Sequence, residues 1–314
     1  MEFVASGKNS PQFARERFIA YDYFLSPSRI VFVDGGHGEL VTSASYVDAF
    51  IRVAAVSFSK NRRVALKKEE GIIRVSTDIE GSQQVFRISG EHFSLPESVN
   101  LEAVTLADTA SRLQAAASHA RRIAEIGFAE ELTAELAEGD VIVLDGTLEP
   151  KTRQERSALE KLYAAAIKSN VLVTALAKTS TMVTNLGNDA LSVLLAVGPK
   201  GPWYYEPLFV PKSDGHNAAI FAVRLHESSK HAFRFEICSK QKAVDWTRLF
   251  GALSMNSRDF TFPGYPYGLI LADRIARVSE HDREFLRARH AGKLGINLDT
   301  EEASANAHQI LDSL

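Results

Sequence analysis

Short runs of apolar residues alternate with charged and Gly-rich segments along the first ninety residues. Residues 30–33 form the first apolar run, and residues 50–59, 71–78 and 83–90 are rich in β-branched residues and bounded by Lys, Arg or Gly. Such runs are typical of strands, and this succession predicts a β-meander. Residues 1–28 mix charges and aromatics, which favours a short helix or a docking arm there.

A helical period replaces this pattern from about residue 108. Apolar residues recur at steps of three and four between Leu113 and Phe128. This spacing predicts an amphipathic helix that reaches about Leu136, with Asp108 or Thr109 as its N-cap.

The middle of the chain predicts a strand, a helix and a strand in succession, at residues 141–144, 154–170 and 171–180. Such a βαβ unit normally pairs its strands in parallel with a right-handed crossover. Further elements are expected as a helix at 188–197, strands at 202–210, 218–226 and 232–238, and helices at 243–254 and about 268–290. We therefore expect one α/β domain built on a mixed sheet.

The composition excludes some classes of protein but does not indicate an activity. The 314 residues are 45% hydrophobic and 24% charged, with a formal net charge of −3, so any nucleic-acid contact has to be local. The single cysteine, Cys238, excludes an internal disulfide and a cysteine-based zinc cluster, and it fits a reducing compartment. No run approaches about 18 uninterrupted apolar residues, and no signal-peptide pattern occurs. A cytoplasmic protein without membrane association is expected.

Two of the predicted strands lead directly into Asp-Gly, at Asp34 and at Asp145. In open α/β sheets the carboxyl ends of strands form the edge where ligands bind, so we expect both carboxylates at one edge. Two close carboxylates stay ionised only if a cation screens them, and Mg²⁺ or Mn²⁺ prefers oxygen ligands. The alternative is that each Asp-Gly is simply a turn.

Four further residues are candidates for the same site. Glu125 lies on the border of the apolar stripe of its predicted helix, and Lys178 follows a buried strand, where it could bind a substrate phosphate. Tyr265 belongs to the Pro/Gly-rich segment 261–268, and Asp273 to the helix after it. A tyrosine in such a loop can stack on a base or bind a phosphate. Each residue also has a structural alternative. Glu125 and Lys178 would then simply be solvated, Tyr265 would pack its loop onto the sheet, and Asp273 would be a charge favoured at the start of a helix.

Motifs of other enzyme classes are missing from the chain. It contains no dinucleotide-binding or Walker-type glycine loop, no HExxH and no GxSxG elbow. Nucleotide-dependent motors, zincins and serine hydrolases of these kinds are therefore not indicated.

The candidate segments, taken together and in order, resemble the motifs of the NurA nuclease family. They are "VDGG" at 33–36, Glu125, "LDGTL" at 144–148, "AKTS" at 177–180 and "GYPYGLILAD" at 264–273. The resemblance implies an α/β fold with an RNase H-like mixed β-sheet flanked by helices. It also implies a nuclease domain at 30–290, an N-terminal arm at 1–29 and a C-terminal tail at 291–314.

The resemblance further implies hydrolysis of single- and double-stranded DNA with Mn²⁺ or Mg²⁺, through 5′ to 3′ exonuclease and single-strand endonuclease action. Family members process DNA ends for recombinational repair, as homodimers working with a HerA-type hexameric ATPase. By position, Asp34, Glu125 and Asp145 match the metal-binding acids. Under a shifted alignment, Glu130 or Glu131 would take the place of Glu125. Tyr265 matches the family's tyrosine, and Asp273 stands where many members carry histidine.

These residues support three hypotheses. The first is a two-metal nuclease with ions roughly 4 Å apart, in which Lys178 or Tyr265 orients the phosphate. The second follows from aspartate at position 273: a catalytically altered or inactive subunit that binds DNA or an ATPase ring. The third is a phosphatase or an RNA hydrolase, because no residue selects DNA over RNA.

Overall fold

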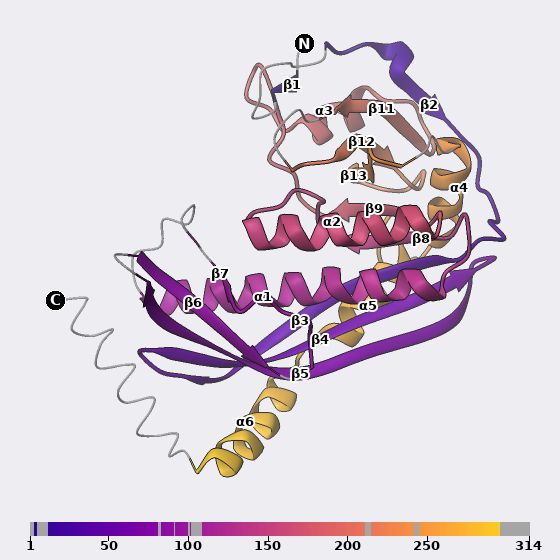
Figure 1. Ribbon diagram of the computed structural model, residues 1–314. Helices are drawn as coiled ribbons and strands as arrows, with labels where there is room; N and C mark the ends of the chain where they lie inside the picture. The colour runs from indigo at the N-terminus through magenta and orange to yellow at the C-terminus, as the bar shows by residue number, and fades with distance from the viewer. Residues whose placement is uncertain are drawn as a thin grey trace.

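The computed structural model describes residues 3–4, 12–80, 83–90, 92–99, 101, 109–210, 215–241 and 245–295. Its strands are β1 (Phe3–Val4), β2 (Phe18–Ala20), β3 (Ile30–Thr42), β4 (Tyr46–Ser59), β5 (Arg62–Glu80), β6 (Gln83–Gly90), β7 (Ser98–Val99), β8 (Val141–Asp145), β9 (Leu172–Ala177), β10 (Val183–Thr184), β11 (Trp203–Phe209), β12 (Ala218–Arg224) and β13 (Phe233–Cys238). The helices are α1 (Thr109–Leu132), α2 (Arg153–Lys168), α3 (Ala190–Val197), α4 (Trp246–Asn256), α5 (Tyr267–Ala276) and α6 (Glu280–Leu294). Figure 1 shows their arrangement.

Eleven strands form one sheet in the order β2-β11-β12-β13-β9-β8-β3-β4-β5-β6-β7. The β3, β8 and β9 strands are parallel, and every other neighbouring pair in this sheet whose register the structure describes is antiparallel. The predicted βαβ unit is therefore confirmed as β8-α2-β9. An antiparallel β5-β4-β3 meander joined to parallel β8 and β9 is the RNase H-like mixed sheet that the resemblance implies.

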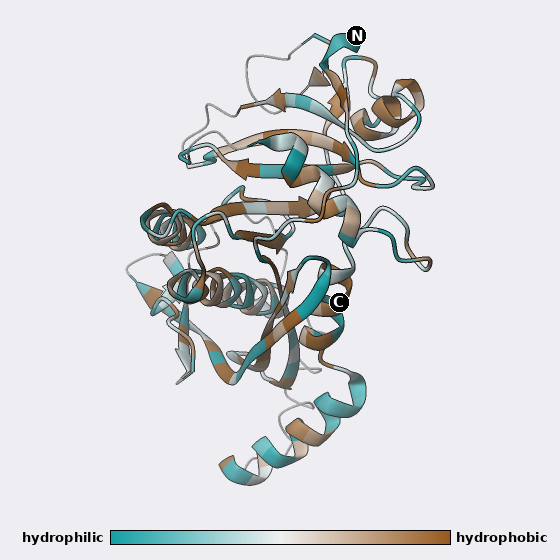
Figure 2. Cartoon of the chain, turned by 90° about the vertical axis from the view of Figure 1, so that its right-hand side faces the viewer, coloured by the Kyte–Doolittle hydropathy of each residue, from teal (hydrophilic) through white to brown (hydrophobic). Residues whose placement is uncertain are grey.

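Helices cover both faces of this sheet. Apolar residues of α1 and α2 pack with Val31 and Val33 of β3, whereas α4 and α5 pack on the other face with Phe32. The alternation follows from the two-residue period of a strand. Figure 2 looks nearly along α1 and α2, and it shows the mostly hydrophilic α6 extending away from the body. Within the described residues, no helix is both long and apolar enough to cross a membrane.

The prediction that Asp34 ends its strand is wrong. The β3 strand continues through the glycine-rich segment to Thr42, and Asp34 pairs with Ala54 in its interior. The reason is non-local: β4 offers a long apolar partner that keeps β3 extended where the local sequence favours a turn. Only Asp145 lies at a strand end, as the last residue of β8.

The single helix predicted at 268–290 is two helices. The chain leaves helical geometry at Arg277, and α6 begins with a capping box between Ser279 and Asp282. Each side chain accepts a hydrogen bond from the other residue's backbone N–H, which ends one helix and starts the next.

The described part of the N-terminal segment, where a short helix or a docking arm was expected, holds one short 3-10 helix and the strands β1 and β2. A short 3-10 turn at Arg15–Arg17 leads into β2, which pairs with β11. The proposed N-cap Asp108 and residues 296–314 of the predicted tail lie outside the described residues. The predicted limits of the arm and the tail stay predictions.

Candidate metal centre

Asp34 and Asp145 lie side by side where two parallel strands separate. The pairing of β3 with β8 ends at Val33 opposite Leu144, so each aspartate is the next residue of its strand. Beyond this point β3 continues with β4, whereas β8 ends. The two carboxylates therefore lie where the two backbones separate.

Helix α5 brings a third acid because it lies directly on β3. A Cβ at Gly268 would come within 1.9 Å of the Phe32 ring, and a Cβ at Gly36 within 2.2 Å of the Ala276 carbonyl oxygen. Any other residue at either position would lift the helix off the strand. This close approach places Asp273, one turn before the helix end, above Asp34.

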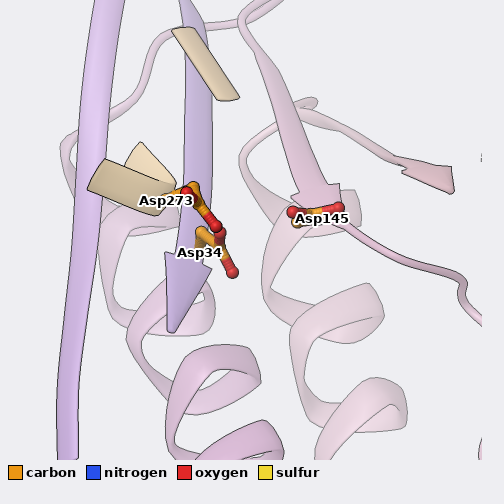
Figure 3. A group of neighbouring side chains, drawn as sticks. All are labelled: Asp34, Asp145 and Asp273. Carbon is orange, nitrogen blue, oxygen red and sulfur yellow. The ribbon is translucent and has the colours of Figure 1, made fainter. Parts of the chain in front are cut away.

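Asp34, Asp145 and Asp273 converge on one point. Asp34 shares a face of the sheet with Phe32, and Asp145 with Val143, both of which pack beneath α5. One oxygen from each of the three carboxylates lies within 4.8 Å of the others. Figure 3 shows the three side chains, from β3, the tip of β8 and α5.

Among the described residues, two cations bind these acids: Arg277, which donates to Asp273 Oδ2 at 2.8 Å from the exposed surface, and Lys178. The Lys178 Nζ donates to Asp145 Oδ2 at 2.7 Å and lies 3.9 Å from Asp273 Oδ1. Burial alone would lower the pKa of Lys178, but the hydrogen bond and charge of Asp145 outweigh it and raise that pKa. The lysine therefore stays charged, as predicted for a phosphate-binding group, but its partner here is Asp145.

The three carboxyl groups outnumber Lys178 and Arg277, the two cations that bind them in the described part of the chain. Burial, followed by the charges of Glu125 and Asp145, raises the pKa of Asp34 to about 8, while the Gly35 N–H and Lys178 act in the opposite direction. A hard divalent cation would relieve this repulsion, and three carboxylate oxygens suit Mg²⁺ or Mn²⁺. The donor set thus fits the predicted metal.

Tyr265 is a buried residue that contacts the cluster through its hydroxyl group. Its ring is 2% exposed and lies edge-on to Phe233, and its hydroxyl donates to Asp145 Oδ1 at 3.3 Å. Burial, followed by the charges of Asp145 and Asp34, raises the pKa of Tyr265, so the hydroxyl stays a donor. Since the ring is enclosed, this tyrosine cannot stack on a base.

Glu125 is fully buried on α1, against the opposite face of β3. Its carboxylate binds Arg122 and, at 2.8 Å, Arg121. Burial raises the pKa of Glu125, and the two arginines partly offset the rise. Glu125 is not among the three acids whose oxygens converge, so its role as a metal ligand stays a prediction.

The two arginines were missed by the sequence reasoning, and they hold the backbone beside both aspartates. Arg121 donates to the Gly35 carbonyl oxygen at 3.1 Å, and Arg122 donates to those of Asp145 at 3.0 Å and Thr147 at 2.7 Å. The signal was available, since residues three and four positions before an inward-facing glutamate share its side of a helix.

Buried acids fix the rest of the loop after Asp145. Glu236 accepts from the Leu148 N–H at 2.8 Å and from His216, and Glu155 accepts from the Lys151 N–H at 2.8 Å. These anchors, with Arg122, restrict the orientation of the aspartate at the end of β8.

Arg122→Ala is expected to destabilise the protein by about 3 kcal/mol, because it removes one partner of a buried ion pair and frees two backbone carbonyls. Urea unfolding would measure the loss. Arg153→Ala, on the exposed surface of α2, is the matched control and should change stability little. Equal stability of the two variants would contradict this role of Arg122.

A groove of about 590 Å³ opens beside the acids. Its described lining has five cations against three acids, together with the hydroxyls of residues 179–181: the cations are Arg121, Arg122, Lys151, Lys178 and Arg234, and the acids are Asp145, Glu149 and Glu155. Cations and hydroxyl donors along one channel suit the phosphates of a polyanion.

Comparison with known proteins gives a family and a fold. The sequence profile described as "NurA domain" matches residues 28–278, while no curated protein matches the chain in sequence. The crystal structure of the NurA nuclease from Sulfolobus solfataricus superposes with a TM-score of 0.55 at 13% identity, over 89% of this chain and 88% of that one.

Two endonuclease V structures are also similar. The human enzyme has a TM-score of 0.42 at 16% identity, over 82% of this chain and 86% of its own. The Ciona intestinalis enzyme in complex with a 24mer DNA has a TM-score of 0.40 at 14% identity, over 87% and 93% respectively.

Proposed function

Because the chain belongs to the NurA domain family, we propose that it is a nuclease that hydrolyses DNA with Mn²⁺ or Mg²⁺. The observation that carries this proposal is the convergence of Asp34, Asp145 and Asp273 within 4.8 Å, next to Lys178 and a cationic groove. Three converging acids beside the half-exposed Lys178 suit a metal that faces a phosphate.

Each residue of the proposed centre would have its own role in the reaction. Asp34, Asp145 and Asp273 would each offer a carboxylate oxygen to the metal. A bound Mn²⁺ or Mg²⁺ would lower the pKa of a water and offset charge on the scissile phosphate. Lys178 would donate to a phosphate oxygen where charge develops, and Tyr265 would keep Asp145 oriented through its hydroxyl.

Glu125 would position the centre indirectly, from the opposite face of β3. By neutralising Arg121 and Arg122, it keeps their side chains on the backbone of both metal-binding strands. To bind metal directly, as the resemblance implies, it would have to leave both arginines.

The finer features of the proposal rest on family membership. They are 5′ to 3′ exonuclease and single-strand endonuclease action, DNA end processing in recombinational repair, a homodimer, and cooperation with a HerA-type hexameric ATPase. The groove beside the acids is consistent with a single strand passing through the site.

Cleavage of end-labelled single- and double-stranded DNA with Mn²⁺, with Mg²⁺ and with EDTA tests the proposal. We expect degradation with either metal and none with the chelator. A folded protein that binds DNA without cutting it would favour the non-catalytic subunit instead. Unlabelled RNA as competitor tests the RNA hydrolase, which would be indicated if RNA were cut in preference.

Lys178→Met is expected to lower the cleavage rate on the order of a hundredfold, because one charged donor to the phosphate is lost. Affinity for DNA should fall much less, since the remaining cations of the groove are unchanged. Single-turnover rates and fluorescence anisotropy would separate the two effects. Lys168→Met, at the exposed end of α2, is the control; an equal rate in both variants would remove Lys178 from the mechanism.

A further inference from the structure

The loop between α4 and α5 presents aromatic rings to solvent. Phe260 is 102% exposed and Phe262 is 41% exposed, whereas Tyr265 at the end of the same loop is 2% exposed. Phe260 is the most exposed of the large apolar side chains in the part of the chain that the structure describes. Two exposed rings two residues apart gather apolar surface on one loop, and apolar surface gathered in this way can mark a binding site.

This loop borders the metal centre. The ring centroid of Phe262 lies 5.7 Å from that of Tyr265, whose hydroxyl donates to Asp145. His231 stacks on Phe262 at 5.9 Å with an interplanar angle of 21°. Ring contacts therefore lead from the acids through Tyr265 to Phe262, two residues from Phe260.

Hydrogen bonds hold the loop in one shape. The Gly264 N–H donates to the Ser257 carbonyl oxygen at 2.8 Å, and the Thr261 N–H donates to Asp259 Oδ1 at 2.9 Å. The Ser257 hydroxyl in turn donates to the Leu253 carbonyl oxygen of α4. Phe260 is thus presented by an ordered turn, and little conformational freedom is lost when a ligand binds it.

The groove beside the acids lacks such rings. Its lining contains cations, carboxylates, hydroxyls and small residues, but no Phe, Tyr or Trp. The ring that does line this groove, that of His119, is bound to Glu155 at 2.6 Å. The exposed rings of Phe260 and Phe262 lie outside the lining, on the α4–α5 loop.

We infer that Phe260 and Phe262 form a stacking platform for unpaired bases of the DNA strand whose phosphates occupy the groove. The inference rests on the proposed nuclease function and adds the substrate feature that is recognised. Base stacking on an aromatic ring is sequence-tolerant, because every base has a π-face. The site would therefore accept a single strand or a frayed end of any sequence.

Fluorescence anisotropy with a labelled 12-residue oligothymidylate tests this platform, with Asp145→Asn in every protein to prevent cleavage. Adding Phe260→Ala is expected to weaken binding about 10- to 100-fold. Phe285→Ala, which removes another exposed phenylalanine (63%) on α6, is the matched control and should bind like the parent. An abasic oligonucleotide of equal length should bind the parent and Phe260→Ala equally.

Each outcome decides between explanations. Equal affinity of the parent and Phe260→Ala for oligothymidylate would overturn the platform, and Phe260 would then be left as a contact for a protein partner. Equal weakening for oligothymidylate and the abasic strand would also overturn it, because no base is then involved. A parent that binds neither oligonucleotide would instead refute the nuclease function itself, and the platform with it.

Discussion

Asp145→Asn is expected to lower the metal-dependent rate of DNA cleavage on the order of a thousandfold while the fold is preserved. Asp145 is one of the three converging acids and the acceptor for both Lys178 and Tyr265. An amide keeps the shape but loses the charge that a hard cation requires. A bound Mn²⁺ or Mg²⁺ would supply several kcal/mol of transition-state stabilisation, and each 1.36 kcal/mol corresponds to about tenfold in rate.

Single-turnover cleavage of end-labelled DNA at saturating Mn²⁺ would measure this loss. Asp78→Asn is the matched control, because Asp78 is an exposed aspartate on β5 whose partner is Arg87. It should cut DNA like the wild type. An Asp145→Asn protein with the wild-type rate would show that the strand-tip carboxylate takes no part in the reaction.

Asp34→Asn is expected to stabilise the metal-free protein at about pH 8, although it removes a residue of the site. The pKa of Asp34 rises from its ordinary value of 3.8 to about 8 in the folded protein. As pH increases through this window, the unfolded chain releases the proton while the folded protein retains it. Folding stability therefore falls between pH 3.8 and about 8, by up to several kcal/mol.

Urea unfolding in EDTA, at about pH 4 and about pH 8, would test the direction in which folding stability changes with pH. The difference in stability between Asp34→Asn and wild type should be small at the lower pH and should favour the variant at the higher pH. Adding Mn²⁺ at the higher pH should stabilise the wild type more than the variant, since metal binding needs the ionised carboxylate. A pH-independent difference would show that Asp34 is already ionised in the folded protein at neutral pH.

Local sequence patterns predicted the helices and strands whose residue period is visible within their own segment. The apolar run of β8 and the helical period of α1 were both recognisable, because each follows the period of one burying face. The break between α5 and α6 was also visible in principle, since Ser279 and Asp282 have the spacing of a capping box. A sustained apolar period across the break concealed it.

The position of Asp34 could not be read from its neighbours. A strand followed by Asp-Gly-Gly has the local sequence of a turn, and only pairing with β4 keeps it extended. Glu125 is a similar case. Its place on the border of an apolar stripe did not show that Arg121 and Arg122 would enclose it.

By itself, the sequence determined the parallel β8-α2-β9 unit and the order of the motifs, because periodicity and motif spacing depend on residues close in the chain. Only the tertiary structure decided that Asp273, and not Glu125, completes the group of converging acids. The physical reason is contact between distant segments. Gly36 and Gly268 let α5 rest on β3, while two arginines hold Glu125 on the opposite face of the sheet.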